Sequence, residues 1–276
     1  MIAPIMNTPH FPARLIFFDC DSTLSSIEGI DELARLKGQF DYIAELTRRA
    51  MDGEIKLEEV FAARLDLLRP TRADLRRIAE VYHDTLVPDA QATIDALQFA
   101  GCQVYIVSGG LLPAVQDFAR SIGLLRSHVR AVPIEFDQLS GQWWHYHRNR
   151  YRGNPDERYL DFADTPLTET QGKRHIIAEI SGKEKRTMLI GDGITDLEAR
   201  DAVKWFVGFG GVARRDRVAA EADIFIEARG LASIVPLALA DEQIEKLIGT
   251  EHEDVLQRGL SDIESGLVKL NDKAKD

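Results

Sequence analysis

One short stretch near the start of the chain constrains the fold more than any other. Four apolar residues at 15–18 lead directly into Asp19, and Asp21 follows after one intervening residue. An apolar run of this length is typical of a strand that is buried on both faces within a parallel sheet. Because side chains alternate along a strand, Asp19 and Asp21 leave its end on the same side. Ligands bind beyond the carboxyl ends of parallel strands, so the pair predicts a site there, although an Asx-type turn also accounts for it.

Size and charge narrow the class of protein. The chain has 276 residues, of which 45% are hydrophobic and 29% charged, as in globular proteins with one large domain or a core with an insert. Its net charge of -11 argues against general binding to nucleic acid or acidic membranes, and no segment approaches the length of a membrane span. The two cysteines form no disulfide or zinc pattern, and residues 1–12 lack the pattern of a signal peptide. We therefore expect a cytoplasmic enzyme without nucleic-acid or membrane partners.

Strands and helices alternate along most of the chain. Beyond the first strand, five buried strands are predicted, at 102–107, 129–136, 187–190, 205–209 and 224–226. This alternation predicts an α/β fold with a doubly wound parallel sheet. Five helices are predicted between the first two strands. The first four lie at 25–37, 40–51, 57–68 and 71–83, with Thr71 as the N-cap of the fourth, and the fifth lies at 88–100. We assign 13–27 and 87–240 to the core and 28–86 to an inserted helical bundle.

Two segments do not fit this alternation. Within residues 137–170, the stretch 143–159 is dense in aromatic and basic residues, which can hold nucleic-acid strands. In an acidic chain we favour instead an extended hairpin that packs on the protein or on a partner chain. The tail, 241–276, is expected to be a helical extension. Its apolar residues alternate spacings of four and three, as in a coiled coil, namely Leu256, Leu260, Ile263, Leu267 and Leu270. Because the run is short, we favour packing on the chain's own core over a dimer seam, and a homodimer stays open.

Polar groups follow the other predicted strands as Asp19 and Asp21 follow the first. Ser108 and Gly109 follow the strand at 102–107, and Asp192 follows the strand at 187–190, with Asp196 four residues later. Ser108 is also explained as a helix N-cap, and Asp192 as a turn residue. Lys173 opens a predicted helix, where a cation opposes the helix dipole unless an anion lies beside it.

Together these groups suit phosphoryl transfer. A carboxylate that attacks a phosphate dianion meets like-charge repulsion, which Mg²⁺ bound by Asp19 and Asp192, and a lysine beside it, would reduce. A serine hydroxyl and the amides of a glycine turn can hold phosphate oxygens. Asp21 is placed to protonate a leaving alcohol and then to activate water.

The chain also resembles a known family. Its motifs resemble the four motifs of haloacid dehalogenase (HAD) superfamily phosphatases, in Asp19-Cys20-Asp21-Ser22-Thr23, Ser108-Gly109-Gly110, Lys173 and Gly191-Asp192-Gly193-Ile194-Thr195-Asp196. Within the superfamily, Glu28-Gly29-Ile30-Asp31-Glu32-Leu33-Ala34, Thr47-Arg48-Arg49-Ala50-Met51 and Arg64-Leu65 are similar to the phosphoserine phosphatase family. The resemblance implies a HAD-like core with a C1-type helical cap. It also implies Mg²⁺ as cofactor and a small phosphorylated substrate, with O-phospho-L-serine favoured. Another small phosphomonoester, and phosphotransfer to an alcohol acceptor, are the alternatives.

The resemblance implies a role for each matching catalytic residue. Asp19 would be the nucleophile and Asp21 the general acid/base. Mg²⁺ would be held by Asp19, by the backbone carbonyl of Asp21 and by Asp192, and Asp196 would support the metal or the lysine. Phosphate would contact three residues, Ser108, Gly109 and the catalytic Lys173.

The resemblance implies three further substrate contacts. Glu28 would meet the ammonium group of the substrate, Arg64 its carboxylate, and Thr195 would contact it from the last motif. Glu28 also has the spacing of a capping box with Ser25, and both roles are compatible. Arg64 falls within the apolar stripe of the helix predicted at 57–68, so its buried charge needs an anionic partner. That partner is an internal carboxylate or, as we favour, the carboxylate of the substrate.

Overall fold

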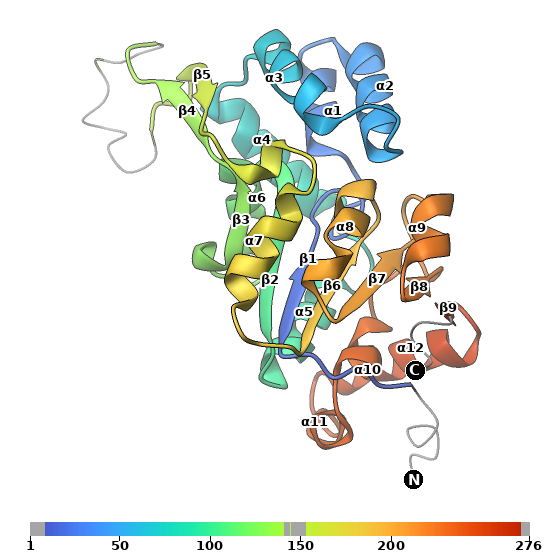
Figure 1. Ribbon diagram of the computed structural model, residues 1–276. Helices are drawn as coiled ribbons and strands as arrows, with labels where there is room; N and C mark the ends of the chain where they lie inside the picture. The colour runs from blue at the N-terminus through green and yellow to red at the C-terminus, as the bar shows by residue number, and fades with distance from the viewer. Residues whose placement is uncertain (1–8, 141–143, 145–152, 272–276) are drawn as a thin grey trace.

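A seven-stranded, mostly parallel sheet forms the centre of the molecule (Figure 1). The computed structural model describes residues 9–140, 144 and 153–271. In sheet order, the strands are β3 (Val129–Val132), β2 (Gln103–Leu111), β1 (Leu15–Phe18), β6 (Thr187–Gly191), β7 (Trp205–Phe209), β8 (Ile224–Ile226) and β9 (Val268–Leu270). Neighbouring strands are parallel except for β8 and β9. Helices flank the sheet, so the predicted α/β fold with a doubly wound parallel sheet is confirmed.

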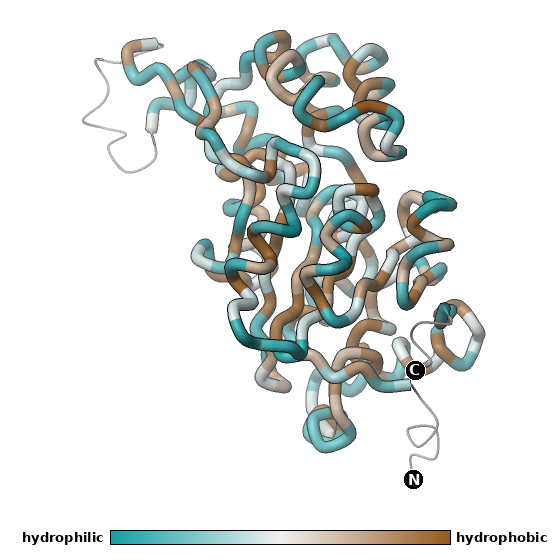
Figure 2. Tube along the Cα trace, in the orientation of Figure 1, coloured by the Kyte–Doolittle hydropathy of each residue, from teal (hydrophilic) through white to brown (hydrophobic). Residues whose placement is uncertain are grey.

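β1 lies in the middle of the sheet, as its apolar sequence predicts. It pairs with β2 on one side and with β6 on the other. Ile16, Phe17 and Phe18 have no exposed surface, and Figure 2 shows that the inner strands are coloured mainly as hydrophobic. The strand order reverses between β1 and β6, which makes this the topological switch point of the sheet. Asp19 and Asp192 come directly after these two strands and therefore meet at one place.

Four helices between β1 and β2 lie together beyond the carboxyl end of β1, at the top of Figure 1. They are α1 (Gly29–Leu36), α2 (Phe40–Met51), α3 (Leu57–Leu68) and α4 (Arg72–Asp84), and we refer to them as the helical cap. The predicted bounds of α2 and α3 are confirmed. The predicted N-cap residue of α4, Thr71, is confirmed as well. Its side chain accepts a hydrogen bond from the backbone N–H of Asp74, and the Asp74 side chain accepts one from the backbone N–H of Thr71.

The first helix of the cap starts later than predicted. It begins at Gly29 rather than at Ser25, and the Glu28 side chain makes no capping hydrogen bond. Ser25 instead pairs with Leu86 through the backbone, and its hydroxyl lies 2.7 Å from that of Thr85. The capping box that the spacing of Ser25 and Glu28 offered as an alternative role is therefore not formed, because Ser25 belongs to a segment that pairs with the return of the chain from cap to core at Leu86.

The strand predicted at 129–136 is divided in two. Pro133 separates β3 from β4 (Ile134–Asp137), and it lacks the backbone N–H that a continuous central strand would need. β4 leaves the main sheet and pairs antiparallel with β5 (Arg158–Phe162). The strands on either side of the predicted hairpin at 143–159 are thus paired, but residues 143 and 145–152 lie outside the described residues, so the hairpin itself stays a prediction.

The β4–β5 pair packs against the helical cap. The Nε atom of Arg72, at the start of α4, donates to the buried carboxylate of Glu157 at 2.5 Å. The rings of Phe61, on α3, and Phe162, on β5, meet edge to face with their centroids 5.2 Å apart. The β4–β5 pair therefore extends the cap with both polar and apolar contacts.

The tail packs on the core, as favoured, but is only partly helical. Leu256 and Leu260 of α12 (Glu253–Glu264) are buried in the core. Gly266 then adopts a left-handed conformation that ends the helix, and Leu270 belongs to β9 at the edge of the sheet. The coiled-coil pattern that included Leu267 and Leu270 is wrong for this reason.

The remaining α-helices complete both faces of the sheet. They are α5 (Ala90–Phe99), α6 (Leu112–Ser121), α7 (Gly172–Ser181), α8 (Ile194–Glu198), α9 (Asp216–Glu221), α10 (Ile234–Ala238) and α11 (Asp241–Glu245). In the view of Figure 1, α7 lies in front of the sheet. Among the described residues, none of these helices is long and apolar enough to span a membrane.

Replacing Leu256 by alanine tests whether the tail belongs to the core. The side chain has no exposed surface, so the cavity should lower the free energy of unfolding by about 2–5 kcal/mol in urea denaturation. Gln257→Ala, at an exposed position on the same helix, is the matched control and should change it by less than about 0.5 kcal/mol. A variant that kept its stability but dissociated from a dimer would show that the tail is a dimer seam instead.

Candidate active site

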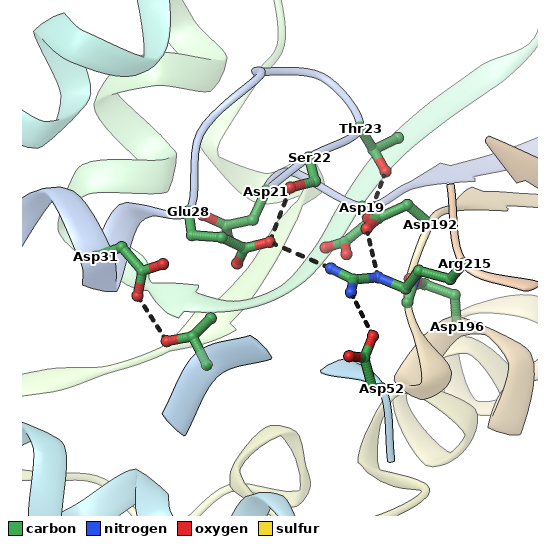
Figure 3. Close-up of polar contacts among 12 residues, drawn as sticks. Asp19, Asp21, Ser22, Thr23, Glu28, Asp31, Asp52, Asp192, Asp196 and Arg215 are labelled. Atoms are coloured by element: carbon green, nitrogen blue, oxygen red, sulfur yellow. Dashed lines mark hydrogen bonds and ion pairs between the residues drawn. The ribbon is translucent and has the colours of Figure 1, made fainter. Parts of the chain in front are cut away.

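Three buried carboxylates and one lysine meet at the switch point of the sheet (Figure 3 shows the carboxylates). Asp19, Asp192 and Asp196 each offer an oxygen, and these oxygens lie within 4.8 Å of one another. Lys173, in the first turn of α7, places its Nζ atom 2.7 Å from Asp19 Oδ2 and 2.7 Å from Asp196 Oδ1. The position of Lys173 at the start of a helix predicts an anion beside it. Asp19 and Asp196 supply part of that negative charge.

A close backbone approach holds Lys173 in place. Gly172 begins α7, and a Cβ atom there would lie 1.6 Å from the carbonyl oxygen of Pro166. Burial alone would lower the pKa of Lys173, but the charges of Asp19 and Asp196 more than offset it and hold the pKa above its ordinary value. The lysine is therefore a fixed, fully charged ammonium group in the site.

Asp21, the second carboxylate of the first motif, accepts hydrogen bonds from several groups. Asp21 Oδ1 accepts from the backbone N–H of Gly29 at 2.6 Å and from the hydroxyl of Tyr82 at 2.7 Å. Ser108 Oγ lies 3.3 Å from Asp21 Oδ2. Burial, followed by the charge of Asp19, raises the pKa of Asp21 to about 6. A carboxyl group with this pKa can exchange a proton near neutral pH.

Asp192 is held by one residue from the first motif and by one outside all four motifs. Thr23 donates to Asp192 Oδ1 at 3.2 Å, and Arg215 Nε donates to Asp192 Oδ2 at 3.2 Å. Arg215 also donates to Asp52, at the end of α2, at 2.8 Å, so it connects the core with the helical cap (Figure 3). Burial and the charge of Asp19 raise the pKa of Asp192 to about 6.

The donor set fits a divalent cation. Mg²⁺ and Ca²⁺ prefer carboxylate oxygens, and three carboxylates here face a single lysine and one arginine. Burial raises the pKa of both Asp21 and Asp192, and the negative charge of Asp19 beside them raises each pKa further. Asp196 accepts from Lys173 and from the backbone N–H of Gly193, which ties its two oxygens to the protein. A cation near Asp19 and Asp192 would relieve the crowding.

Glu28 faces the same carboxylates from the start of the cap. Its Oε1 accepts from the hydroxyl of Ser22 at 2.8 Å, and Arg215 lies 4.0 Å from it. Burial and the charge of Asp21 raise the pKa of Glu28 well above its ordinary value. Since its only ion pair within the described residues is this long one, Glu28 can accept another cationic group.

Arg64, on α3, is buried, and no described carboxylate lies within ion-pair distance of it. Its side chain is only 4% exposed, and its Nη1 atom donates to Thr47 Oγ1 at 3.1 Å. Asp31 is reached only through Thr47, whose hydroxyl donates to Asp31 at 2.6 Å. Nε has no hydrogen-bond partner, and the guanidinium forms no ion pair with any residue that the structure describes. The partner predicted for Arg64 was an internal carboxylate or the carboxylate of the substrate. Among the described residues, no carboxylate contacts the guanidinium directly.

One cavity of about 60 Å³ between core and cap joins most of the predicted site residues. Those that line it are Asp19, Asp21, Glu28, Arg64, Gly109, Lys173, Asp192 and Thr195. Ser108 and Asp196 do not line it but contact Asp21 and Lys173 from behind. Ser108 also lies within β2, which runs on to Leu111 and not only to residue 107.

Two site residues were missed in the sequence. Arg215 contacts Asp192 from 23 residues away, and Tyr82 contacts Asp21 from 61 residues away. Tyr82 reads in sequence as an apolar residue of α4. Arg215 lies in a run with Arg214 and Arg217, and no spacing distinguishes it from them.

Comparison with known proteins identifies related sequences. Residues 13–203 match the family model of haloacid dehalogenase-like hydrolases. Human phosphoserine phosphatase is 32% identical over 78% of this chain and 90% of its own length. The chloroplastic phosphoserine phosphatase of Arabidopsis thaliana is 34% identical over 76% of this chain and 68% of its own length.

Solved structures show the same similarity in three dimensions. A phospho-aspartyl intermediate analogue of phosphoserine phosphatase superposes with a TM-score of 0.66 at 26% identity, over 81% of this chain and 98% of its own. A substrate-bound phosphoserine phosphatase complex superposes with a TM-score of 0.66 at 25% identity, over 81% of this chain and 97% of its own. These matches confirm the resemblance that the motifs predict.

The charge crowding predicts that Mg²⁺ stabilises the protein more at high pH than at low pH. Asp21 and Asp192 have pKa values of about 6 when folded and an ordinary value of 3.8. Between these values the folded state binds more protons, so their contribution to the free energy of unfolding falls as pH rises towards 6. Above pH 6 both are charged, and a bound cation relieves their repulsion.

Melting temperatures with Mg²⁺ and with a chelator measure this effect. Saturating Mg²⁺ should raise the melting temperature by about 5 °C or more near pH 7.5, and by much less near pH 5. Asp192→Asn should lose most of the increase, whereas Asp241→Asn, at the surface far from the site, should keep it. An equal increase at both pH values would contradict the role of these carboxylates.

Proposed function

Because the chain belongs to the haloacid dehalogenase-like hydrolase family, we propose that it hydrolyses O-phospho-L-serine to L-serine and phosphate with Mg²⁺ as cofactor. The observation that carries this substrate is the buried guanidinium of Arg64, which lines the cavity without an anionic partner among the described residues. A buried unpaired charge is costly, and a guanidinium binds a carboxylate through two parallel hydrogen bonds. The curated relatives named above are phosphoserine phosphatases, which supports the same choice.

Each charged group of phosphoserine finds a counterpart in the cavity. In this proposal Arg64 binds the carboxylate, Glu28 binds the ammonium group and Thr195 contacts the body of the substrate. The phosphate is held by Lys173 and by the backbone of Gly109. The hydroxyl of Ser108, which now lies 3.3 Å from Asp21 Oδ2, would turn to donate to the phosphate.

The first chemical step transfers the phosphoryl group to the protein. An oxygen of Asp19 attacks phosphorus, and the bond from phosphorus to the serine oxygen breaks. Asp21, protonated as its raised pKa permits, gives its proton to the departing oxygen. Lys173 neutralises charge on the phosphate, and Asp196 holds that lysine in position. Mg²⁺, bound by Asp19, Asp192 and the backbone carbonyl of Asp21, would neutralise further charge on the phosphate oxygens.

The second step releases phosphate. Asp21, now a carboxylate, takes a proton from water, and the water oxygen attacks phosphorus. The bond between phosphorus and the Asp19 oxygen breaks, which restores the carboxylate of Asp19 and the proton of Asp21. Each residue ends the cycle as it began.

The division into core and cap, the cellular location and the absence of macromolecular partners belong to the same proposal. A core of residues 13–27 and 87–240 and a cap of residues 28–86 enclose the substrate, so the cap must open for it to enter. We propose a cytoplasmic location, and the net charge of -11 supports the absence of nucleic-acid or membrane partners. A homodimer is compatible with this proposal.

Arg64→Ala tests the substrate. For wild type we expect phosphoserine to lead a panel of small phosphomonoesters with Mg²⁺. The variant should lose about 100-fold in kcat/KM for phosphoserine, mainly through KM, because two charge-assisted hydrogen bonds to the carboxylate are lost. Phosphoethanolamine, which lacks the carboxylate, should lose less than about threefold.

Arg77→Ala, on an exposed face of α4, is the matched control and should behave as wild type. Equal losses for both esters would show that Arg64 serves the fold and not the substrate. Faster hydrolysis of another ester by wild type would keep the chemistry but reject phosphoserine. Phosphorylated alcohol in place of free phosphate would reject hydrolysis.

A further inference from the structure

Tyr82 reaches the acid/base carboxylate from the last turn of α4. It is 1% exposed, and its hydroxyl donates to Asp21 Oδ1 at 2.7 Å. None of the motifs that identify the site includes this residue. A buried phenol that touches a reacting carboxylate is therefore without an assigned role.

The two carboxylate oxygens of Asp21 receive different numbers of hydrogen bonds. Oδ1 accepts two short hydrogen bonds, from Tyr82 and from the backbone N–H of Gly29 at 2.6 Å. Oδ2 has one longer contact, 3.3 Å from Ser108 Oγ. A carboxyl oxygen that accepts two hydrogen bonds has both lone pairs engaged, so the proton of the acid belongs on Oδ2. Tyr82 supplies one of the two hydrogen bonds that distinguish Oδ1 from Oδ2, and the backbone of Gly29 supplies the other.

Packing fixes the tyrosine in this position. Its ring lies against Phe118 of α6, with the centroids 5.4 Å apart. A Cβ atom at Gly29 would lie 2.0 Å from the Tyr82 hydroxyl oxygen, so only glycine leaves room for it. Because a phenol has an ordinary pKa near 10, the hydroxyl remains a donor at neutral pH.

We propose that Tyr82 is a positioning residue for the acid/base Asp21, and that it holds Oδ1 so that Oδ2 delivers the proton. The proposal rests on the proposed function, in which Asp21 is the acid. As the bond from phosphorus to the leaving oxygen breaks, the proton of Oδ2 passes to that oxygen. In the second step Oδ2 takes a proton back from water.

The choice of leaving group separates this role from a structural one. A serine alkoxide is a poor leaving group and needs the proton, whereas nitrophenolate departs without one. Loss of the positioning hydroxyl should therefore slow transfer from phosphoserine and spare transfer from p-nitrophenyl phosphate. A tyrosine that only anchors the cap would affect both esters alike.

The test compares Tyr82→Phe with wild type in single-turnover reactions, with Mg²⁺ and with enzyme in excess over substrate. Under these conditions, release of serine or nitrophenolate reports the first step alone. We expect serine release to slow about tenfold, the effect of one lost hydrogen bond to a charged group, with KM for phosphoserine changed less than about twofold. Nitrophenolate release should stay within about twofold of wild type.

Tyr105→Phe, on β2 with its ring stacked on His128, is the matched control and should change neither rate. The melting temperature of Tyr82→Phe, which lacks a single oxygen, shows that the variant is folded. Equal slowing of both esters, a large rise in KM, or no slowing of serine release would each overturn the proposal.

Failure of the proposed function is recognised separately, by wild type alone. If wild type does not cleave phosphoserine, the alkyl phosphate that it cleaves fastest takes its place. The role of Tyr82 is then still decided by comparing two ratios. Each is the rate of Tyr82→Phe divided by the rate of wild type, one for the alkyl ester and one for the aryl ester.

Discussion

The crowding of carboxylates around one lysine is the constraint on which this structure depends. Asp19, Asp192 and Asp196 are buried with their oxygens within 4.8 Å of one another, and Lys173 touches two of them. Such an arrangement costs free energy unless positive charge balances it. The sheet enforces it, because β1 and β6 are neighbours and end at the same edge. A site that needs a further cation, beside a lysine that can receive an anion, suits a reaction on a phosphate ester.

The helical cap is tied to these carboxylates at several points. Arg215 joins Asp192 to Asp52 at the end of α2, and Tyr82 of α4 donates to Asp21. The buried Arg64 completes the cavity from α3. The two groups that would bind the ammonium and carboxylate of the substrate, Glu28 and Arg64, therefore lie on the cap, whereas Thr195 and the groups that would act on the phosphate lie on the core. One cavity between core and cap is lined by both sets, so recognition and chemistry would meet in the same place.

What the sequence predicts well is local. The apolar run of β1, and the bounds of α2 and α3, follow from periodicity and from nearby glycine and proline. The sequence also predicts that polar groups gather at the strand ends, because parallel strands end at one edge. Contacts across 23 and 61 residues, from Arg215 and Tyr82, leave no periodic signal and were missed. The tail was misread beyond Ile263 because Gly266 ends the helix where the spacing continues.

The most direct test of this account is to trap the phosphorylated protein. Rapid quenching during turnover of phosphoserine, followed by borohydride, reduces an acyl phosphate on an aspartate to homoserine, which peptide mass spectrometry locates. The account predicts homoserine at position 19 in wild type, and none in Asp19→Asn. Homoserine at Asp21 or Asp192, or its absence from wild type during steady phosphate release, would contradict the assignment of Asp19 as nucleophile.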